Sequence, residues 1–316
     1  MCKTTFKIGI LLVLIVVYTK TSAQFSYQNL FVQYDSLWTF RKLSLIPVKF
    51  KRDGLHVNDA DLPKNIISFK EALLSGKCAI KEIKINKGSD VSVLVLKNKT
   101  GKTIFINAGE IVTGGKQDRI TGEATFISPK KEDQYLSVFC AEKGRWDDKE
   151  KPFHYHSVAD MGVKKKIDIE HRQTEVWKEI AEQFNGNKTL SETFAYASLL
   201  KKNQEEEDAY KAFFIEKLKH SDSTFSGFIA VTGNRIIACE LFSMAEYCIK
   251  NYDGMVLSFV HSLKEEDGIP SLHRNSIEHF ADELLGSEDS QKKMLQSSGK
   301  ADKWQGKIFH LIAYGN

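Results

Sequence analysis

The sequence has few cysteines, and none of them form the closely spaced pairs that bind zinc or carry out redox chemistry. There are five in 316 residues, and no two are separated by only two residues. Four lie in the body of the chain, at Cys78, Cys140, Cys239 and Cys248. This even number permits two disulfides in an exported protein, but the pairing does not follow from the sequence. Because Cys140 and Cys239 lie in apolar, strand-like runs, buried thiols are the preferred interpretation.

Established catalytic signatures are also missing. No serine stands in a GxSxG motif, and no GxxxxGK[ST] phosphate-binding loop is present. No repeat of the length found in solenoid proteins occurs either. The sequence therefore does not state an activity outright, whether the protein is an enzyme stays open, and we predict no cofactor.

The longest apolar run in the chain is too short to span a membrane. It covers residues 8–18, whereas a membrane-spanning helix needs about 20 apolar residues. Lys3 and Lys7 precede the run, and the small residues Thr21 and Ala23 follow it. This order is typical of a secretory signal peptide. We therefore predict a signal peptide at residues 1–23, cleavage near Ala23, and a soluble exported protein, periplasmic or secreted, without a stable membrane anchor.

The excess of positive charge is small. The formal net charge is +4, but Lys3, Lys7 and Lys20 lie in the predicted leader, which has no acidic residue, so the mature chain carries +1. Proteins that bind nucleic acid usually keep a concentrated basic face. Short runs such as the three lysines at 164–166 are better explained as solvated surface, and we expect no nucleic-acid partner.

The order of the sequence patterns predicts an α+β protein. The first half is rich in strand patterns that favour a mostly antiparallel sheet, at residues 29–34, 37–50, 79–85, 91–96, 102–107, 111–112, 116–120 and 135–142, with one short helix at 67–75. A polar segment at 147–168 is predicted to be a loop. Helical patterns follow at 173–184, 191–202, 205–219, 243–263 and 275–285, with a β-hairpin at 228–241 and a last strand at 307–314. We predict a single domain over 24–316, with a β-rich part at 24–146 and a helical and mixed part at 169–316.

Chemically capable side chains gather in one stretch, residues 106–146. Donors suited to carboxylate or phosphate stand beside two turn glycines, whose amides add to an anion site. The predicted ligand-binding residues are Gly114, Gly115, Lys116, Gln117, Arg119, Arg145 and Trp146. Strand alternation would place Lys116 and Asp118 on one face and Gln117 and Arg119 on the other. The alternative is that these charges pair with one another, for example Asp118 with Arg145.

Three carboxylates in the same stretch are candidates for acid and base catalysis. They are Glu110, Asp118 and Glu142. If their strands adjoin, two of them could act as a general acid and a general base. A carboxylate that bonds a loop amide at the edge of a sheet is the commoner outcome.

Two histidines invite comparison with a metal site. His154 and His156 lie one residue apart, with Asp160 and His171 nearby. On a strand this pair would face one side, as zinc or copper requires. The segment is predicted to be a loop and offers no third ligand at fixed spacing, so we predict exposed histidines and no metal.

The order of four segments resembles a known family. INAGEIVTGGKQDRI, LSVFCAEKGRW, QTEVWKEIAEQ and GFIAVTGNRIIACELFSMAEY are similar to the bacterial ARG and rhodanese-phosphatase-superfamily-associated protein domains, over roughly residues 27–314. The resemblance implies a mixed α/β fold and no settled activity.

Three functions remain open from the sequence. The preferred one is binding of a small anionic or polar ligand through the Gly-Gly-Lys-Gln-Asp-Arg region. The second is a hydrolase that acts on a phosphate- or ribose-containing substrate, and the third is a structural or interaction module of the cell envelope. The oligomeric state does not follow from the sequence.

Overall fold

The computed structural model describes residues 25–51, 62–83, 91–130, 132–146, 151–184, 191–201 and 204–315. The predicted signal peptide, residues 1–23, lies outside the described residues. Within the described ranges, no helix has both the length and the apolar character needed to cross a membrane.

One sheet joins the beginning of the chain to its end. It runs in the order β1-β3-β13-β14-β16-β15, β2 also pairs with β3, and every pairing is antiparallel. Its strands are β1 (Leu30–Val32), β2 (Trp38–Phe40), β3 (Leu43–Phe50), β13 (Phe225–Thr232), β14 (Arg235–Phe242), β15 (Gly299–Trp304) and β16 (Lys307–Tyr314). The first strands of the predicted β-rich half therefore belong with the C-terminal hairpins.

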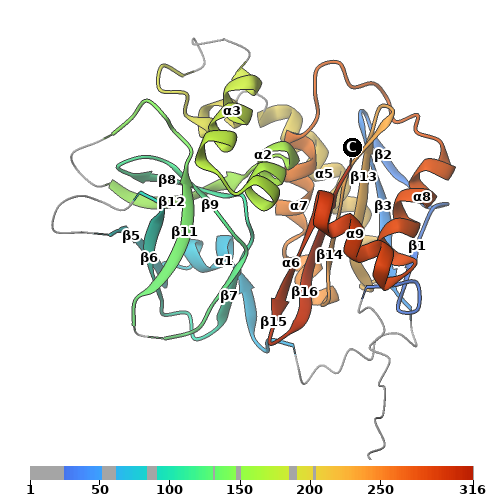
Figure 1. Ribbon diagram of the computed structural model, residues 1–316, viewed down its shortest axis with the longest axis horizontal. Helices are drawn as coiled ribbons and strands as arrows, with labels where there is room; N and C mark the ends of the chain where they lie inside the picture. Colours follow the sequence, from blue (N-terminus) through green and yellow to red (C-terminus); the bar gives the residue numbers. More distant parts are fainter. Residues whose placement is uncertain are drawn as a thin grey trace, which may run out of the picture.

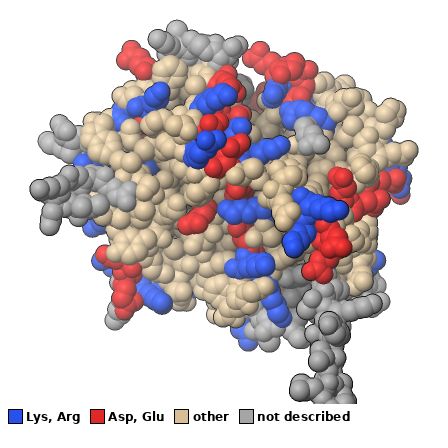
Figure 2. Space-filling model, in the orientation of Figure 1, with Lys and Arg blue, Asp and Glu red and all other residues tan. Residues whose placement is uncertain are grey.

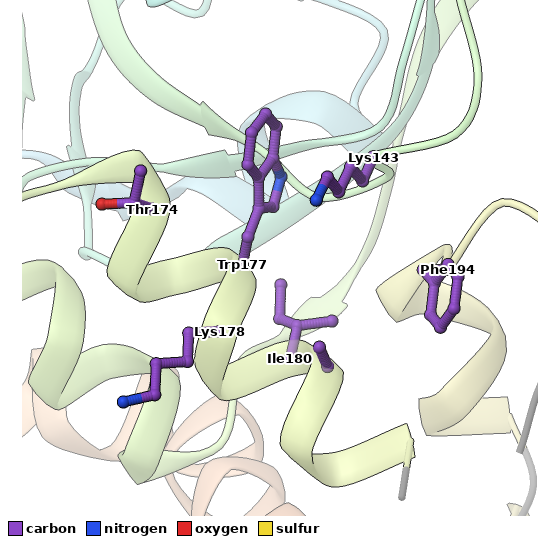
Figure 3. A pocket seen from close by; sticks show the side chains of 7 residues that line it. Lys143, Thr174, Trp177, Lys178, Ile180 and Phe194 are labelled. Atoms are coloured by element: carbon purple, nitrogen blue, oxygen red, sulfur yellow. The ribbon is translucent and has the colours of Figure 1, made fainter. Parts of the chain in front are cut away.

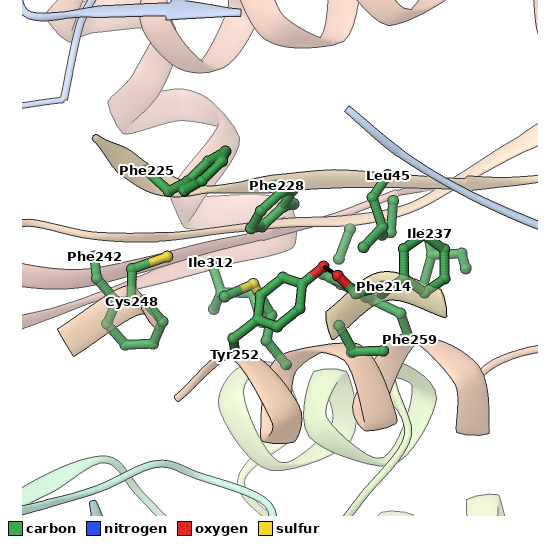
Figure 4. Packing of buried hydrophobic residues seen from close by; sticks show 14 of the residues in the cluster. Leu45, Phe214, Phe225, Phe228, Ile237, Phe242, Cys248, Tyr252, Phe259 and Ile312 are labelled. Atoms are coloured by element: carbon green, nitrogen blue, oxygen red, sulfur yellow. Dashed lines mark hydrogen bonds between the residues drawn. The ribbon is translucent and has the colours of Figure 1, made fainter. Parts of the chain in front are cut away.

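Helices cover both faces of this sheet (Figure 1). β3 and β13 are buried along their whole length, and successive side chains such as Leu45 and Ile46 enter different cores. One core contains α5 (Gln204–Lys219), α6 (Ala245–Lys250) and α7 (Tyr252–His261), and the other contains α8 (Arg274–Leu285) and α9 (Glu288–Ser298). In the first core the Tyr252 hydroxyl donates to the carbonyl of Phe214 over 3.1 Å (Figure 4).

The other structural half of the molecule, which we call the curled half, is built on a curled antiparallel sheet. Its order is β12-β8-β9-β11-β6-β5, and the end strands β5 and β12 lie near each other. The strands are β5 (Cys78–Glu82), β6 (Val93–Asn98), β8 (Glu110–Gly115), β9 (Arg119–Thr121), β11 (Gln134–Cys140) and β12 (Lys151–Val158). A small sheet of β4 (Ile66–Ser68), β7 (Thr103–Ile106) and β10 (Thr125–Ile127) and the helix α1 (Phe69–Leu74) share its core.

A group of helices lies on the other side of the curled sheet. It comprises α2 (Met161–Lys165), the π-helix η3 (Lys166–Glu170), α3 (Gln173–Phe184) and α4 (Tyr196–Leu200). Val176, Ile180 and Phe184 of α3 pack on Ile111 and Ile120 of β8 and β9. These three α3 residues have the helical spacing expected of a buried stripe.

The α+β class is confirmed, but several predicted elements are wrong. The largest error is the loop at 147–168, because its described part forms β12, α2 and η3. Its pattern is not strand-like because β12 is an edge strand that starts with Lys151 and Pro152 and stays partly exposed on both faces.

Two further elements differ in their boundaries. The strand predicted at 37–50 is a hairpin, β2 and β3, that turns at Arg41 with a positive φ of 48°. The helix predicted at 243–263 is interrupted at Asn251 and forms α6 and α7. The elements β10, α9 and β15 are not predicted from the sequence.

Candidate functional site

The two turn glycines are required by the close approach of β12. Gly114 and Gly115 end β8 with φ values of +125° and +54°. A Cβ at Gly114 would lie 2.2 Å from the carbonyl oxygen of Pro152, and one at Gly115 would lie 2.2 Å from Cζ of Phe153. Both positions combine a backbone conformation that favours glycine with space only for glycine. The glycines therefore serve packing, and the Gly114 amide is not open to an anion, because it donates to Asp118 over 3.0 Å.

Arg119 is fully buried and paired inside the protein. Its Nη2 lies 3.3 Å from Oε1 of Glu82, a buried carboxylate of β5. Its Nη1 donates to Oε1 of Gln117 over 2.9 Å, and the amide of Gln117 donates to the carbonyl of Glu142 over 3.0 Å. Gln117 and Arg119, both predicted to bind ligand, thus hydrogen-bond to each other, and their further partners include Glu142 and Glu82.

Arg145 connects two of the predicted catalytic carboxylates. Its Nη2 lies 2.8 Å from Oδ1 of Asp118, and its Nε lies 2.5 Å from Oε2 of Glu142. It also donates to the carbonyls of Lys116 and Gly114. Burial raises the pKa of Asp118, with the Gly114 amide and Arg145 acting in the opposite direction and Glu142 adding to the rise. The pairing of Asp118 with Arg145 that the sequence offered as an alternative is present.

Lys116 and Trp146 lie at the surface of this network. The Lys116 ammonium is 4.9 Å from the centre of the Trp146 ring, and 47% of Trp146 is exposed. Lys116, Gln117 and Asp118 form the turn between β8 and β9 instead of a strand. The predicted alternation of faces is therefore wrong, since a turn lets Gln117 and Asp118 both point inward.

Glu110 makes its contacts in a different cluster. It is buried beside the Asn107 amide, which donates to its Oε1 over 3.0 Å. Burial raises the pKa of Glu110 to about 8, a shift that the amide and Lys164 reduce. Of the three candidate carboxylates, the structure joins Asp118 and Glu142 through one arginine and leaves Glu110 apart from them.

The cluster near Glu110 is a line of four charged groups between the two halves of the molecule. Lys164 of α2, which the sequence assigned to solvated surface, is instead buried and lies 3.3 Å from Glu240 of β14. Glu240 lies 3.0 Å from Nε2 of His310 on β16. Nδ1 of His310 lies 2.8 Å from Asp302 of β15. Burial opposes the charge on Glu240, but Lys164 and His310 lower its pKa to about 2. We call this line the four-charge cluster.

We call the bonded side chains of Gln117, Asp118, Arg119, Glu142 and Arg145 the hairpin network. A groove lies beside this network, and the sequence did not indicate the groove. It has a volume of about 370 Å³ and is lined by Lys143, Thr174, Trp177, Lys178, Ile180, Ala181 and Phe194. Figure 3 shows Trp177 and Phe194 on opposite sides of the space above Ile180, with the Lys143 amine turned towards Trp177. The amine of Lys178 and the hydroxyl of Thr174 point away from this space.

Trp177 and Lys143 are the residues that the sequence interpretation passed over. Trp177 lies on α3 beside the buried stripe but is only partly buried, and its Nε1 donates to the carbonyl of Cys140 over 3.1 Å. The Lys143 ammonium lies 5.5 Å from the Trp177 ring centre. One signal was available: Trp177 is adjacent to Val176 on the helix and so lies at the border of the apolar stripe.

The histidines and cysteines give no metal site within the described residues. His154 and His156 lie on β12, so the predicted loop is wrong there. His154 is exposed as predicted, whereas His156 is partly buried, and burial lowers its pKa. The described ranges hold no group of three or more His, Cys, Asp or Glu residues placed to bind a metal. All four cysteines of the body are free and buried.

Charges of both signs are mixed on one face of the molecule. Figure 2 shows lysines and arginines next to aspartates and glutamates over the face that it presents.

The fold and the hairpin network define an α+β protein in which a helix-covered antiparallel sheet is joined to a smaller curled sheet. The family model of the ARG and Rhodanese-Phosphatase-superfamily-associated Protein domain matches residues 31–311. The chain belongs to this family, and the match covers nearly all of its length. No curated protein and no solved structure matches the chain.

Proposed function

We propose that this protein is an exported binding protein for a small anion with an apolar body, and that the groove beside the hairpin is its site. The observation that carries the proposal is the position of Lys143. Its ammonium faces an aromatic ring at a groove of about 370 Å³, and no carboxylate of the described residues lies within 4.0 Å of it. Apolar walls with one convergent charge are typical of small-molecule sites.

The hairpin network supports this site indirectly. Gln117, Arg119 and Arg145 were expected to bind the ligand themselves, but each of them hydrogen-bonds to other groups of the protein. They fix the segment that carries Lys143, because Glu142 and Arg145 on either side of it pair with each other over 2.5 Å. A charge held on a rigid segment binds with less loss of conformational entropy.

The experiment compares two naphthalene derivatives that differ in charge. Binding of 2-naphthoate and of the neutral 2-naphthamide is measured by calorimetry, with wild-type protein, Lys143→Gln and Lys178→Gln. We expect wild type to prefer the carboxylate, and Lys143→Gln to weaken its binding about fivefold, which corresponds to about 1 kcal/mol. Lys178→Gln is the matched control, because its amine points away from the groove (Figure 3).

Two outcomes would contradict the proposal. One is the absence of saturable binding by wild-type protein, and the other is an equal effect of both lysine variants. Export is a separate prediction from residues 1–23, and the intact mass of the protein recovered outside the cytoplasm tests cleavage after Ala23.

A further inference from the structure

Phe194, which forms one wall of the groove, has an unusual backbone conformation. Its φ is +54°, in the left-handed region that aromatic residues rarely adopt. Such a conformation costs on the order of 1 kcal/mol or more and persists only where the surroundings hold it. The contacts on both sides of Phe194 show what holds it.

The preceding residue is fixed by the hairpin network. The hydroxyl of Thr193 donates to Oε1 of Glu142 over 2.6 Å, and the Gly144 amide donates to the Thr193 carbonyl over 2.9 Å. The other oxygen of Glu142 is held by Arg145. A Cβ at Gly144 would lie 2.8 Å from Cα of Thr193, so the two segments touch along their backbones.

The following residues are tied to the helix that forms the opposite wall. The hydroxyl of Tyr196 donates to Oδ2 of Asp160. The same oxygen accepts a hydrogen bond from Gln183 of α3 over 2.9 Å. The segment that carries Phe194 and the helix that carries Trp177 therefore share one anchor, Asp160, which also caps α2 through the amide of Gly162.

We infer that the groove is a preformed slot for flat aromatic anions, and that Glu142 and Arg145 are positioning residues that act through Thr193 to hold Phe194 opposite Trp177. This inference rests on the proposed function and specifies its ligand class. A planar ring places its face or edge against both aromatic walls, and such contacts add to the burial of area alone. A saturated ring of the same skeleton is thicker and has no π face. Because the walls are held in place before binding, the slot does not adapt to it.

The experiment measures the preference for a flat ring in matched threonine variants. Binding of 2-naphthoate and of decahydro-2-naphthoate is measured for wild type, Thr193→Val, Thr193→Ser and Thr125→Val. Wild type should prefer the flat acid by about tenfold. Thr193→Val lacks the hydroxyl that reaches Glu142 and should reduce this preference to about twofold. Thr193→Ser keeps the hydroxyl and should restore it.

Thr125→Val is the control for the change of threonine to valine, because Thr125 lies on β10 and does not line the groove, and it should keep the wild-type preference. If valine at position 193 prevents folding, Thr193→Ala removes the hydroxyl without adding a methyl group. Wild type that binds neither acid would overturn the proposed function itself. Equal binding of the flat and the saturated acid by wild type would overturn the inferred preference for flat rings but would not contradict the proposed function. An unchanged preference in a folded Thr193 variant without the hydroxyl would overturn the positioning role.

Discussion

Replacing Lys164 by methionine should destabilise the protein strongly, because it removes one member of the four-charge cluster. Lys164 is 4% exposed and its stem packs on Gly109, where a Cβ would lie 2.6 Å from the lysine Cγ. Methionine keeps most of this stem, so the change tests the charge and not the packing. Breaking a buried ion pair costs about 3–5 kcal/mol. Glu240 keeps His310 as a partner at 3.0 Å, so we expect the lower end, about 3 kcal/mol.

The assay is urea unfolding followed by circular dichroism, in which the midpoint falls while the slope stays constant. Lys250→Met is the control, because Lys250 pairs with Glu246 at 2.7 Å but both side chains are exposed. Exposed pairs of this kind contribute about 0.5 kcal/mol or less. A loss below about 1 kcal/mol in Lys164→Met, or one equal to the control, would refute the assignment of a buried, energetically coupled cluster.

Two further predictions concern the same architecture. Burial alone would lower the pKa of His310, but its bonds to Asp302 and Glu240 raise it to about 9. The contribution of His310 to the free energy of unfolding is therefore complete below its unfolded pKa of about 6.5 and should be lost as the pH rises through about 9, a decline of on the order of 3 kcal/mol. Unfolding measured from pH 6 to 10 should show this decline in wild type and not in His310→Gln. Gly115→Ala should cost more than 2 kcal/mol of stability, because the new Cβ would meet Phe153 at 2.2 Å at a φ of +54°. Gly101→Ala is the control and should cost about 1 kcal/mol, because Gly101 also has a positive φ but has nothing within 4 Å of the new Cβ. Equal shifts of the thermal unfolding midpoint in the two variants would contradict the packing argument.

The elements that the sequence predicted well are those with a strong local pattern. The bounds of α3 agree with the prediction, because Val176, Ile180 and Phe184 repeat at helical spacing on one buried face. The hairpin of β13 and β14 is present as predicted, and its turn has Gly233 at a φ of +47°. In both cases the information lies within a few residues of the element itself.

The pairing of the sheets could not be predicted in this way. β3 reads as part of the β-rich first half, yet it pairs with β13, almost two hundred residues further on. The alternation of apolar and polar residues along a strand shows which of its faces are buried, but it does not show which strand lies beside it.

Only some of the contacts in the stretch 106–146 could be predicted. The stretch 106–146 does contain a dense set of interacting charges, including the pair of Asp118 with Arg145. Sequence alone could not show that Arg119 forms a buried ion pair with Glu82 of β5, because that contact joins distant segments. The groove needs Lys143 and Phe194 from two loops and Trp177 from a helix, so no single motif contains it.

The antiparallel sheet shared by both ends of the chain has a consequence for synthesis. β3 leaves the ribosome early, with both of its faces apolar, but its partner β13 follows only after the whole curled half, and the helices α8 and α9 that cover one of its faces follow later still. The curled half lies between them in the sequence and contains its own core, so it can form first. Until β13 has been synthesised, β3 pairs only with β1 and β2 and keeps one unpaired edge and an uncovered apolar face, which is the kind of segment that aggregates or recruits chaperones. Truncation at the C-terminus should therefore be more harmful to folding than a change of the same size in the curled half.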